Sequence, residues 1–321
     1  MSIVKEGASQ HRLSCNFLPS RCFILRGVPE DSQHRITRRR FLQLSGLGTA
    51  GLVAYSGEFE RHRLEVTHRT IALTRLSPAL DGLRIAQISD IHYEQYTEPY
   101  FVRQVVEQIN KLAPDLALLT GDYVSEGPMP PSYGAKSSYP CAEILTGIRC
   151  LQRWCVLGNH DVKVGSKIVI DALQSQGLPV LQNRHVPFER NGARLWIAGV
   201  KDIGESNPDL DRAAPRGLQT AQEPVILLAH EPDYADHVVR HGGVDLMLSG
   251  HSHGGQIRLP WVGALYTPPM AHKYVEGHFH LGNGLQLYVN RGIGTVGIPV
   301  RFDCRPELTL LTLRSANSQT A

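Results

Sequence analysis

A short apolar run that ends in Asp, Asn or His recurs five times along this 321-residue chain, and this pattern limits the fold more than any other feature. Continuous apolar runs of this length are typical of strands that are buried on both faces of a sheet. In open α/β sheets the carboxyl ends of such strands gather the ligand-binding side chains at one edge. The sequence therefore predicts an α/β fold with a site built from the residues that follow the runs: Asp90-Ile91-His92, Gly121-Asp122, Gly158-Asn159-His160-Asp161, His230 and Gly250-His251-Ser252-His253.

The stretches between these runs predict the helices and loops of the same fold. Apolar side chains recur at helical spacing over residues 100–112, between the runs 83–89 and 115–119, which is the pattern of a β-α-β unit. Residues 225–248 repeat this pattern. Residues 123–140 are rich in Pro, Gly, Ser and Tyr, so we expect a loop there, which either faces a substrate or simply connects two elements.

Two histidines, His251 and His253, stand two residues apart in a Gly-rich segment. In a turn, both rings can point at one metal ion, and neutral imidazole is the commonest metal ligand in proteins. Alone, this pair would favour two solvated loop histidines. The carboxylates and histidines that end the other four runs favour a shared metal site instead.

The order of the blocks, Asp-x-His, Gly-Asp, Gly-Asn-His-Asp, His and Gly-His-x-His, resembles that of the calcineurin-like metallophosphoesterases over residues 83–313. The resemblance implies a four-layer αββα sandwich of two mixed sheets flanked by helices. It also implies a metal-dependent phosphoric ester hydrolase, in which a hydroxide activated by two metal ions attacks the phosphorus atom.

The same resemblance assigns seven side chains to two divalent metal ions. They form a set for the first ion, a set for the second ion and one bridging carboxylate: Asp90, His92 and His253; Asn159, His230 and His251; and Asp122. This mixture of oxygen and imidazole ligands suits Mn, Fe or Zn.

Three further residues are expected to take part in the reaction, two of them by contacting the substrate. By resemblance, His160 contacts the scissile phosphate and is the general acid for the leaving oxygen, while Asp161 holds the other ring nitrogen of His160. Arg291 lies in the Gly-rich segment 290–294, where its guanidinium could bind the phosphate in a bidentate manner. The alternative for Arg291 is an ordinary turn residue.

Residues 1–56 are predicted to form a leader. They carry eight Lys or Arg and three Asp or Glu, so the leader holds a charge of +5 and the remainder −2 of the total of +3. The folded domain is therefore not basic, and its charge does not indicate nucleic-acid binding. The segment Thr37-Arg38-Arg39-Arg40-Phe41-Leu42-Gln43 precedes an apolar stretch and resembles a twin-arginine export signal. An amphipathic helix with a basic start is the alternative.

This interpretation divides the chain into the leader 1–56 and a metallophosphoesterase domain 57–321, with the twin-arginine translocase as a partner. We expect export to the periplasm or cell envelope, where an uncleaved leader would anchor the protein to the membrane. Ala54-Tyr55-Ser56 is the best candidate for a cleavage site. Because this route exports folded proteins, the metal ions can be bound before export.

Residues 251–260 and 291–302 resemble an exported bacterial phosphodiesterase branch of the family, which includes relatives acting on the pyrophosphate of a UDP-linked lipid A precursor. We therefore expect hydrolysis of a phosphodiester or pyrophosphate bond at the cell envelope, in a lipid- or nucleotide-linked substrate. The alternatives are a UDP-2,3-diacylglucosamine pyrophosphate hydrolase of lipid A synthesis, a phosphomonoesterase, and a non-catalytic binding module with the same fold.

Overall fold

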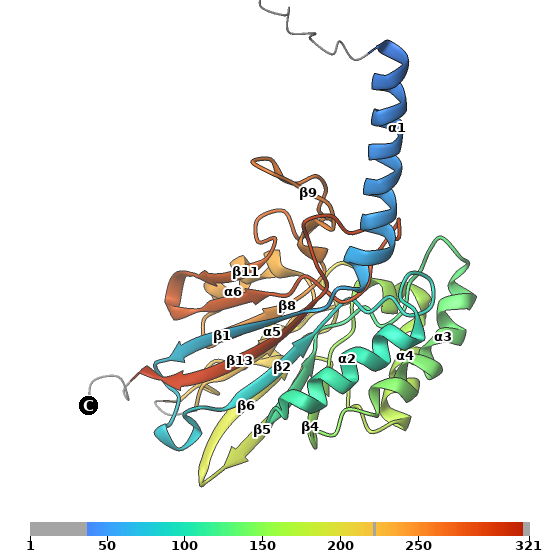
Figure 1. The fold of residues 1–321 in the computed structure, drawn as a ribbon. Coiled ribbons are helices and arrows are strands. Elements are labelled where there is room, and N and C mark those ends of the chain that lie inside the picture. Colours follow the sequence, from blue (N-terminus) through green and yellow to red (C-terminus); the bar gives the residue numbers. More distant parts are fainter. Residues whose placement is uncertain (1–36, 221–222, 317–321) are drawn as a thin grey trace, which may run out of the picture. The chain divides into compact units, whose positions relative to one another are not determined.

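Two mixed β-sheets lie face to face within the residues that the computed structural model describes, 37–220 and 223–316 (Figure 1). The first sheet has the order β1-β13-β2-β3-β4, with the bounds Glu65–Leu73, Glu307–Ser315, Arg84–Ile88, Leu116–Leu119 and Gln152–Cys155. The second has the order β11-β12-β8-β7-β6-β5, with the bounds Gly277–His280, Gln286–Val289, Leu246–Ser249, Val225–Leu228, Ala193–Gly199 and Arg184–Arg190. A separate hairpin pairs β9 (Arg258–Leu259) with β10 (Gly263–Ala264).

Parallel pairing at the centre of both sheets explains the continuous apolar runs. Strands β2, β3 and β4 run parallel in the first sheet, as do β6, β7, β8 and β12 in the second. Every residue of β3, β7 and β8 is buried, because both faces of these strands are covered. β13, β5 and β11 each pair antiparallel with a neighbour, so both sheets are mixed.

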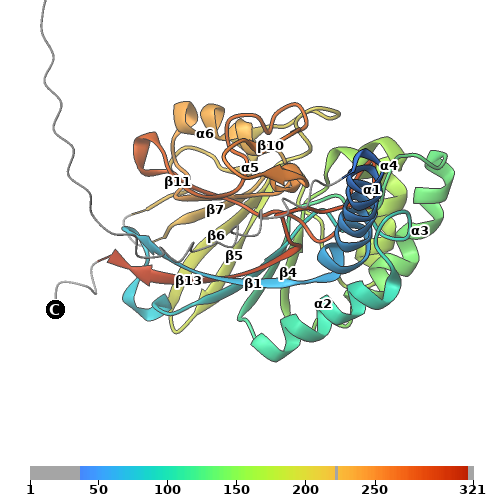
Figure 2. The ribbon, with the colours of Figure 1, turned by 45° about the horizontal axis from the view of Figure 1, so that its top comes forward.

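Helices cover the outer face of each sheet (Figure 2). α2 (Pro99–Leu112), α3 (Pro131–Leu145) and α4 (Asn159–Ser175) share an apolar cluster with β2 and β3. α5 (Leu210–Ala213) and α6 (Ala235–His241) share a second cluster with β6, β7 and β8, and a third cluster lies between the two sheets. These three apolar layers confirm the predicted four-layer αββα sandwich.

The predicted loop over residues 123–140 is wrong in its second half, because α3 begins at Pro131. Proline suits the first position of a helix, since its missing N–H needs no partner there. Small buried residues then let α3 pack closely on its surroundings, and a Cβ on Gly134 would collide with Ser125 and Val164. Tertiary packing therefore outweighs the low helix propensity of this segment, which even contains Pro140 inside the helix.

Two other elements differ from the pattern in the sequence. Apolar spacing predicts a helix from residue 166, whereas α4 begins at Asn159 and loses helical geometry at Gly165, whose φ is 134°. The apolar pattern also fails to predict β5, an edge strand in which only Phe188 is fully buried. The early start of α4 matters for function, because it places Asn159 and His160 in the first helical turn.

α1 (Arg38–Ala54) contains the arginines of the predicted export signal and exposes every one of its residues. The chain divides into two compact units between Gly46 and Leu47, inside α1. Within the described residues, no helix combines the length and the apolar character that crossing a membrane requires. Predictions about residues 1–36 lie outside the described part of the chain.

Residues on both sides of the predicted boundary contact the segment 301–304. Ser56 is buried, and its carbonyl oxygen accepts a hydrogen bond from the Arg301 N–H at 3.1 Å. Glu60 is also buried, and its Oε1 accepts a hydrogen bond from the Cys304 N–H at 3.3 Å. A truncation that begins at residue 57 would therefore remove a backbone contact of the domain.

Candidate metal centre

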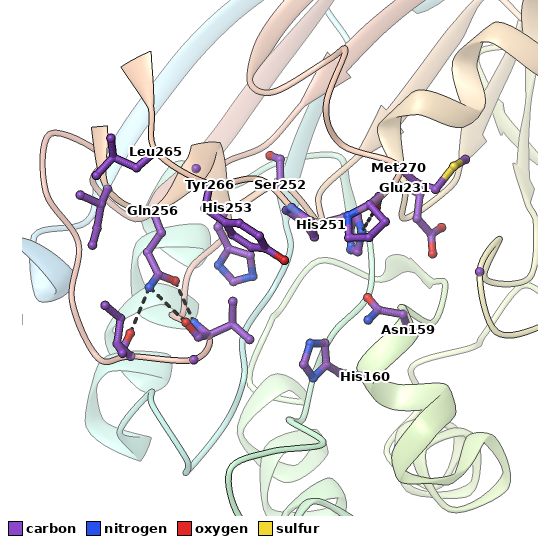
Figure 3. A pocket seen from close by; sticks show the side chains of 18 of the residues that line it. Asn159, His160, Glu231, His251, Ser252, His253, Gln256, Leu265, Tyr266 and Met270 are labelled. Carbon is purple, nitrogen blue, oxygen red and sulfur yellow. Dashed lines mark hydrogen bonds between the residues drawn. The ribbon is translucent and has the colours of Figure 1, made fainter. Parts of the chain in front are cut away.

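The residues that follow the five apolar runs meet at the carboxyl edge of strands from both sheets, and Figure 3 shows four of them: Asn159, His160, His251 and His253. Strands β2, β3, β4, β7 and β8 position them in this order: Asp90 with His92, Asp122, Asn159 with His160, His230, and His251 with His253. The edge forms because the ends of neighbouring parallel strands lie side by side.

A first group of metal-binding side chains consists of Asp90, His92 and His253, whose candidate ligand atoms all lie within 4.8 Å of one another. His92 Nε2 faces His253 Nε2 at 3.0 Å, and His253 Nε2 lies 3.4 Å from Asp90 Oδ1. The Nδ1 atom of His92 contacts Ser125 Oγ at 2.8 Å, which fixes the orientation of this ring. No motif in the sequence singles out Ser125.

A second group consists of Asp122, His230 and His251, again with candidate ligand atoms within 4.8 Å of one another. His230 Nε2 lies 3.1 Å from Asp122 Oδ2, and the same carboxylate oxygen lies 3.7 Å from His92 Nε2 of the first group. Asp122 therefore stands between the two groups.

Backbone carbonyls hold two rings of the second group. His230 Nδ1 donates to the Thr120 carbonyl at 2.6 Å, and His251 Nε2 donates to the Pro269 carbonyl at 2.8 Å. Each hydrogen bond fixes a tautomer and leaves the opposite nitrogen with a lone pair. Neither carbonyl could be identified from the sequence as a partner of these histidines. Pro269 in particular lies in a segment without any metal motif.

The unpaired polar atoms of this site fit a pair of divalent metal ions. Asn159 Oδ1 and His230 Nε2 are buried and have no hydrogen-bond partner. Two imidazole Nε2 atoms, those of His92 and His253, point at each other. Buried polar atoms are normally satisfied, so such a group of unsatisfied acceptors is what a cation site leaves when the protein is considered alone.

Electrostatics in the site favour histidines that are ready to bind a metal. Burial lowers the pKa of His92 and of His253 well below the usual value and that of His251 to about 4, so these rings are neutral at pH 7. Burial would also lower the pKa of His230, but the carboxylate of Asp122 outweighs burial and raises it. A cation bound to the same atoms would displace that proton.

The backbone at the site is strained. Five of the site residues have left-handed φ angles of 53, 48, 57, 68 and 52°, which are uncommon for side chains other than glycine: Asp90, His92, Asp122, His251 and His253. Each such residue costs about 1–3 kcal/mol, and the surrounding structure must hold it in place. Glycines leave the necessary room, because a Cβ on Gly250 would collide with Ser89 and Asp90.

His160 lies beside both groups. Its backbone N–H donates to Asp122 Oδ1 at 2.9 Å, and its ring centroid lies 4.8 Å from that of His92. Its Nδ1 accepts a hydrogen bond from the backbone N–H of Glu126 at 3.2 Å. Because Nδ1 is the acceptor, the neutral ring carries its hydrogen on Nε2.

Asp161 does not hold His160, so the expected pairing is corrected here. Its carboxylate oxygens instead accept hydrogen bonds from four backbone N–H groups, at 2.8, 2.9, 3.2 and 3.0 Å: those of Asp122, Tyr123, Val124 and Gly158. The carboxylate is completely buried. Asp161 therefore ties the start of α4 to the segment that follows β3, and positions the backbone of Asp122.

Arg291 also differs from its prediction, because three carboxylates bind its guanidinium group. Its Nε lies 3.3 Å from Glu307 and 3.7 Å from Glu276, and its Nη2 lies 3.1 Å from Glu65. Arg291 is not one of the described residues that line the cavity beside the site histidines. Arg291 is therefore not placed to bind a substrate phosphate in this cavity, contrary to the prediction.

Arg301 is the arginine that organises the Gly-rich turn, and no motif in the sequence predicts this role. Its completely buried guanidinium group donates to four carbonyl oxygens, those of Arg291, Gly292, Gly294 and Cys304. Gly294 N–H in turn donates to the carbonyl of Asp90 at 2.7 Å. Arg301 thus supports the backbone of a metal-site residue from behind.

A cavity of about 570 Å³ opens beside the site (Figure 3). Its polar side contains Asn159, His160, His251 and His253, together with Lys163, Glu205, Glu231 and Gln256. The rest of its lining is mainly apolar and contains Ile257, Leu265, Tyr266, Pro268, Pro269, Met270, Val296 and Ile298. The size suits a ligand with a large substituent next to the metal-binding groups.

Comparison with known proteins agrees with this geometry. Residues 83–255 match the family described as calcineurin-like phosphoesterase. The chain is 32% identical over 296 residues to the uncharacterized metallophosphoesterase YkuE of Bacillus subtilis (strain 168), covering 88% of this chain and 99% of that protein. It is 31% identical over 285 residues to phosphodiesterase YaeI of Escherichia coli (strain K12), covering 87% and 99%.

A more distant relative has a lipid-linked substrate in its name. The chain is 28% identical over 316 residues to UDP-2,3-diacylglucosamine pyrophosphatase LpxG of Chlamydia trachomatis, covering 80% of this chain and 91% of that protein. Clustered carboxylates and histidines at strand ends, the two-sheet sandwich and the family match agree with one another. This chain therefore belongs to the calcineurin-like phosphoesterases and is a metal-dependent phosphoester hydrolase.

Proposed function

We propose that this chain uses two divalent metal ions, Mn, Fe or Zn, to hydrolyse a phosphodiester or pyrophosphate bond in a substrate of the cell envelope. The observation that carries the proposal is the position of Asp122, whose Oδ2 lies 3.1 Å from His230 Nε2 and 3.7 Å from His92 Nε2. A carboxylate shared by two groups of ligands is the arrangement that a two-metal site requires.

The proposed ligands divide between the two ions and the bridge as Asp90, His92 and His253; Asn159, His230 and His251; and Asp122. When bound, the ions would acidify a water molecule and neutralise charge on the phosphoryl group. The protein holds its ligands through Ser125, Thr120 and Pro269, which fix the ring orientations. No rearrangement of these rings is then needed when substrate arrives.

His160 would act on the leaving group. The Glu126 N–H occupies its Nδ1, so the neutral ring offers an Nε2–H to a substrate oxygen. We propose that this Nε2–H hydrogen-bonds the leaving oxygen and stabilises the negative charge that develops on it as the bond to phosphorus breaks, while solvent supplies the proton that the oxygen finally takes up. Asp161 contributes indirectly, by holding the backbone of Asp122 and Gly158.

The cavity favours a diester or pyrophosphate over a monoester. A phosphomonoester has one organic substituent, whereas a diester or pyrophosphate has a second group that must lie beside the metal ions. The apolar wall formed by Leu265, Pro268 and Met270 offers a place for that group. A pyrophosphate linked to UDP-2,3-diacylglucosamine is the alternative substrate, and the name of the relative LpxG favours it.

Activity on two chromogenic esters tests this preference. With Mn²⁺ or Zn²⁺ restored to the metal-stripped chain, we expect kcat/KM for bis-p-nitrophenyl phosphate to exceed that for p-nitrophenyl phosphate by about tenfold or more, because only the diester fills the apolar side of the cavity. A higher kcat/KM for the monoester under both metals would contradict the proposal and favour a phosphomonoesterase.

We further propose that the twin-arginine translocase exports the folded protein to the periplasm or cell envelope. Two features of the sequence support this: the arginine pair Arg38 and Arg39, and the apolar residues of α1 that follow it. This route also lets the folded protein bind its metal ions before export. Replacing both arginines with Lys should retain the chain in the cytosol of a host that exports the parent chain, as measured by fractionation and immunoblotting. Arg40→Lys, at the variable position of the signal, is the matched control and should be exported. Export of the double variant would refute the signal.

A further inference from the structure

Twelve consecutive residues without a charged side chain, 259–270, lie beside the cavity. They begin in the hairpin formed by β9 and β10, which Figure 1 shows extending outward beyond the sheets. At its tip, Trp261 is fully exposed and Val262 is 69% exposed. Large apolar side chains that gather on a surface in this way usually mark an interaction site.

The hairpin is attached firmly to the turn that carries the metal-site histidines. Leu265 N–H donates to the Ile257 carbonyl at 3.0 Å, and Arg258 N–H donates to the Phe302 carbonyl at 2.9 Å. A Cβ on Gly255 would collide with Ala264, so the two segments are in close contact. The exposed apolar side chains therefore belong to a defined element of the fold.

The exposed surface continues into the cavity without interruption. Leu265 and Tyr266 are 56% and 70% exposed, yet both also line the cavity (Figure 3). Ile298, from a later segment of the sequence, is half exposed and also lines the cavity. An apolar path thus leads from the tip of the hairpin to the histidines of the site.

We propose that residues 259–266 insert into the interfacial region of a lipid bilayer, so that a phosphoester amphiphile can pass from the membrane into the cavity. The proposal rests on the proposed function, because the site that it serves is the phosphoesterase site.

A lipid surface fits this hairpin better than a protein partner, for two reasons. Trp and Tyr, which stand at the tip and at the cavity entrance, are the residues that favour the membrane–water interface. The stretch has no charge to desolvate, and the flanking Arg258 is paired with Glu276 at 3.0 Å. Insertion should therefore depend on apolar contact and should survive high salt, unlike attraction through the arginines of α1.

Quenching of Trp261 by brominated phosphatidylcholine vesicles tests the proposal with the full chain. Of the three Trp residues, Trp154 is buried and Trp196 is partly buried, so Trp261 is the one available to lipid. We expect quenching at high salt in the parent chain and its loss in Trp261→Phe. Val262→Asp should weaken vesicle binding about tenfold, because it places a charge at the inserted tip.

Leu151→Asp is the matched control, since Leu151 is 91% exposed and lies outside the hairpin. This variant should bind vesicles like the parent. Val262→Asp and Leu151→Asp should both retain turnover of the soluble diester bis-p-nitrophenyl phosphate. Absence of that turnover in the parent chain itself would instead refute the proposed function.

Three results would overturn the inference. One is quenching that persists in Trp261→Phe, and a second is vesicle sedimentation without any quenching. The third is a dimer of the parent chain that Val262→Asp dissociates in the absence of lipid, which would make the hairpin a contact between two copies.

Discussion

The Asp122→Asn variant is expected to lose about 1,000-fold in kcat on a phosphodiester and to bind fewer metal ions than the parent chain. The Asp122 carboxylate lies within 3.7 Å of a histidine from each group, and Asn would remove the negative charge that lets two cations bind close together. Steady-state hydrolysis of bis-p-nitrophenyl phosphate and metal analysis of the dialysed protein would measure the two effects.

Two variants make this experiment specific. Asp171→Asn removes a carboxylate from the exposed face of α4, where it pairs with Lys167, and should change neither kcat nor metal content. His160→Ala should lower kcat by about 100-fold or more while the metal content stays the same, because His160 acts on the leaving group. Near-normal activity of Asp122→Asn with two bound ions would exclude the shared carboxylate.

Replacing Asp161 with Asn should lower the free energy of unfolding by about 3 kcal/mol. Asp161 is completely buried and accepts hydrogen bonds from four backbone N–H groups. An Asn amide would turn an N–H₂ group toward some of these donors and leave them without an acceptor. Urea unfolding of the metal-stripped protein would measure the change without the contribution of bound metal.

The same variant distinguishes the two roles considered for Asp161. If Asp161 positions the backbone, its replacement reduces stability in the metal-stripped protein, where no catalysis occurs. The exposed Asp171→Asn on the same helix should alter stability by less than about 0.5 kcal/mol. Unchanged stability of Asp161→Asn combined with a large fall in kcat would restore the sequence prediction, in which Asp161 holds His160.

The positions of the site residues could be predicted from the sequence because they follow buried strands. Runs such as 116–119 and 225–228 are apolar at every position, and all of their residues are buried between two layers. A polar residue directly after such a run must lie at the edge of the sheet. Asp122 and His230 follow such runs closely, so the sequence alone predicts that their side chains lie near the ends of other strands.

Helix boundaries were less predictable, because packing decided them. Residues 131–140 contain Pro, Gly and Ser, which favour a loop, yet they form the first part of α3. Gly134 lies so close to Ser125 and Val164 that no larger residue fits, and this contact exists only after the chain has folded. Local propensity carries no information about such a contact.

Hydrogen-bond partners were the least predictable feature of the site. The family resemblance predicted that Asp161 holds His160, but α4 turns their side chains to different neighbours. The Gly-rich segment favoured Arg291 as a phosphate-binding residue, yet three carboxylates hold Arg291. Four carbonyl oxygens surround Arg301, ten positions later, for which no role was predicted.

The sequence by itself determined the family, the order of the buried strands along the chain and the residues that end them. The family follows from the resemblance carried by the five ordered blocks, whereas the strands and their last residues follow from hydrophobic periodicity and residue type, which are properties of short segments. Only the tertiary structure decided which atoms each side chain contacts, where α3 begins and which apolar residues stay exposed on the β9–β10 hairpin. These depend on contacts between segments far apart in the chain, whose directions are set when the two sheets and their helices pack together.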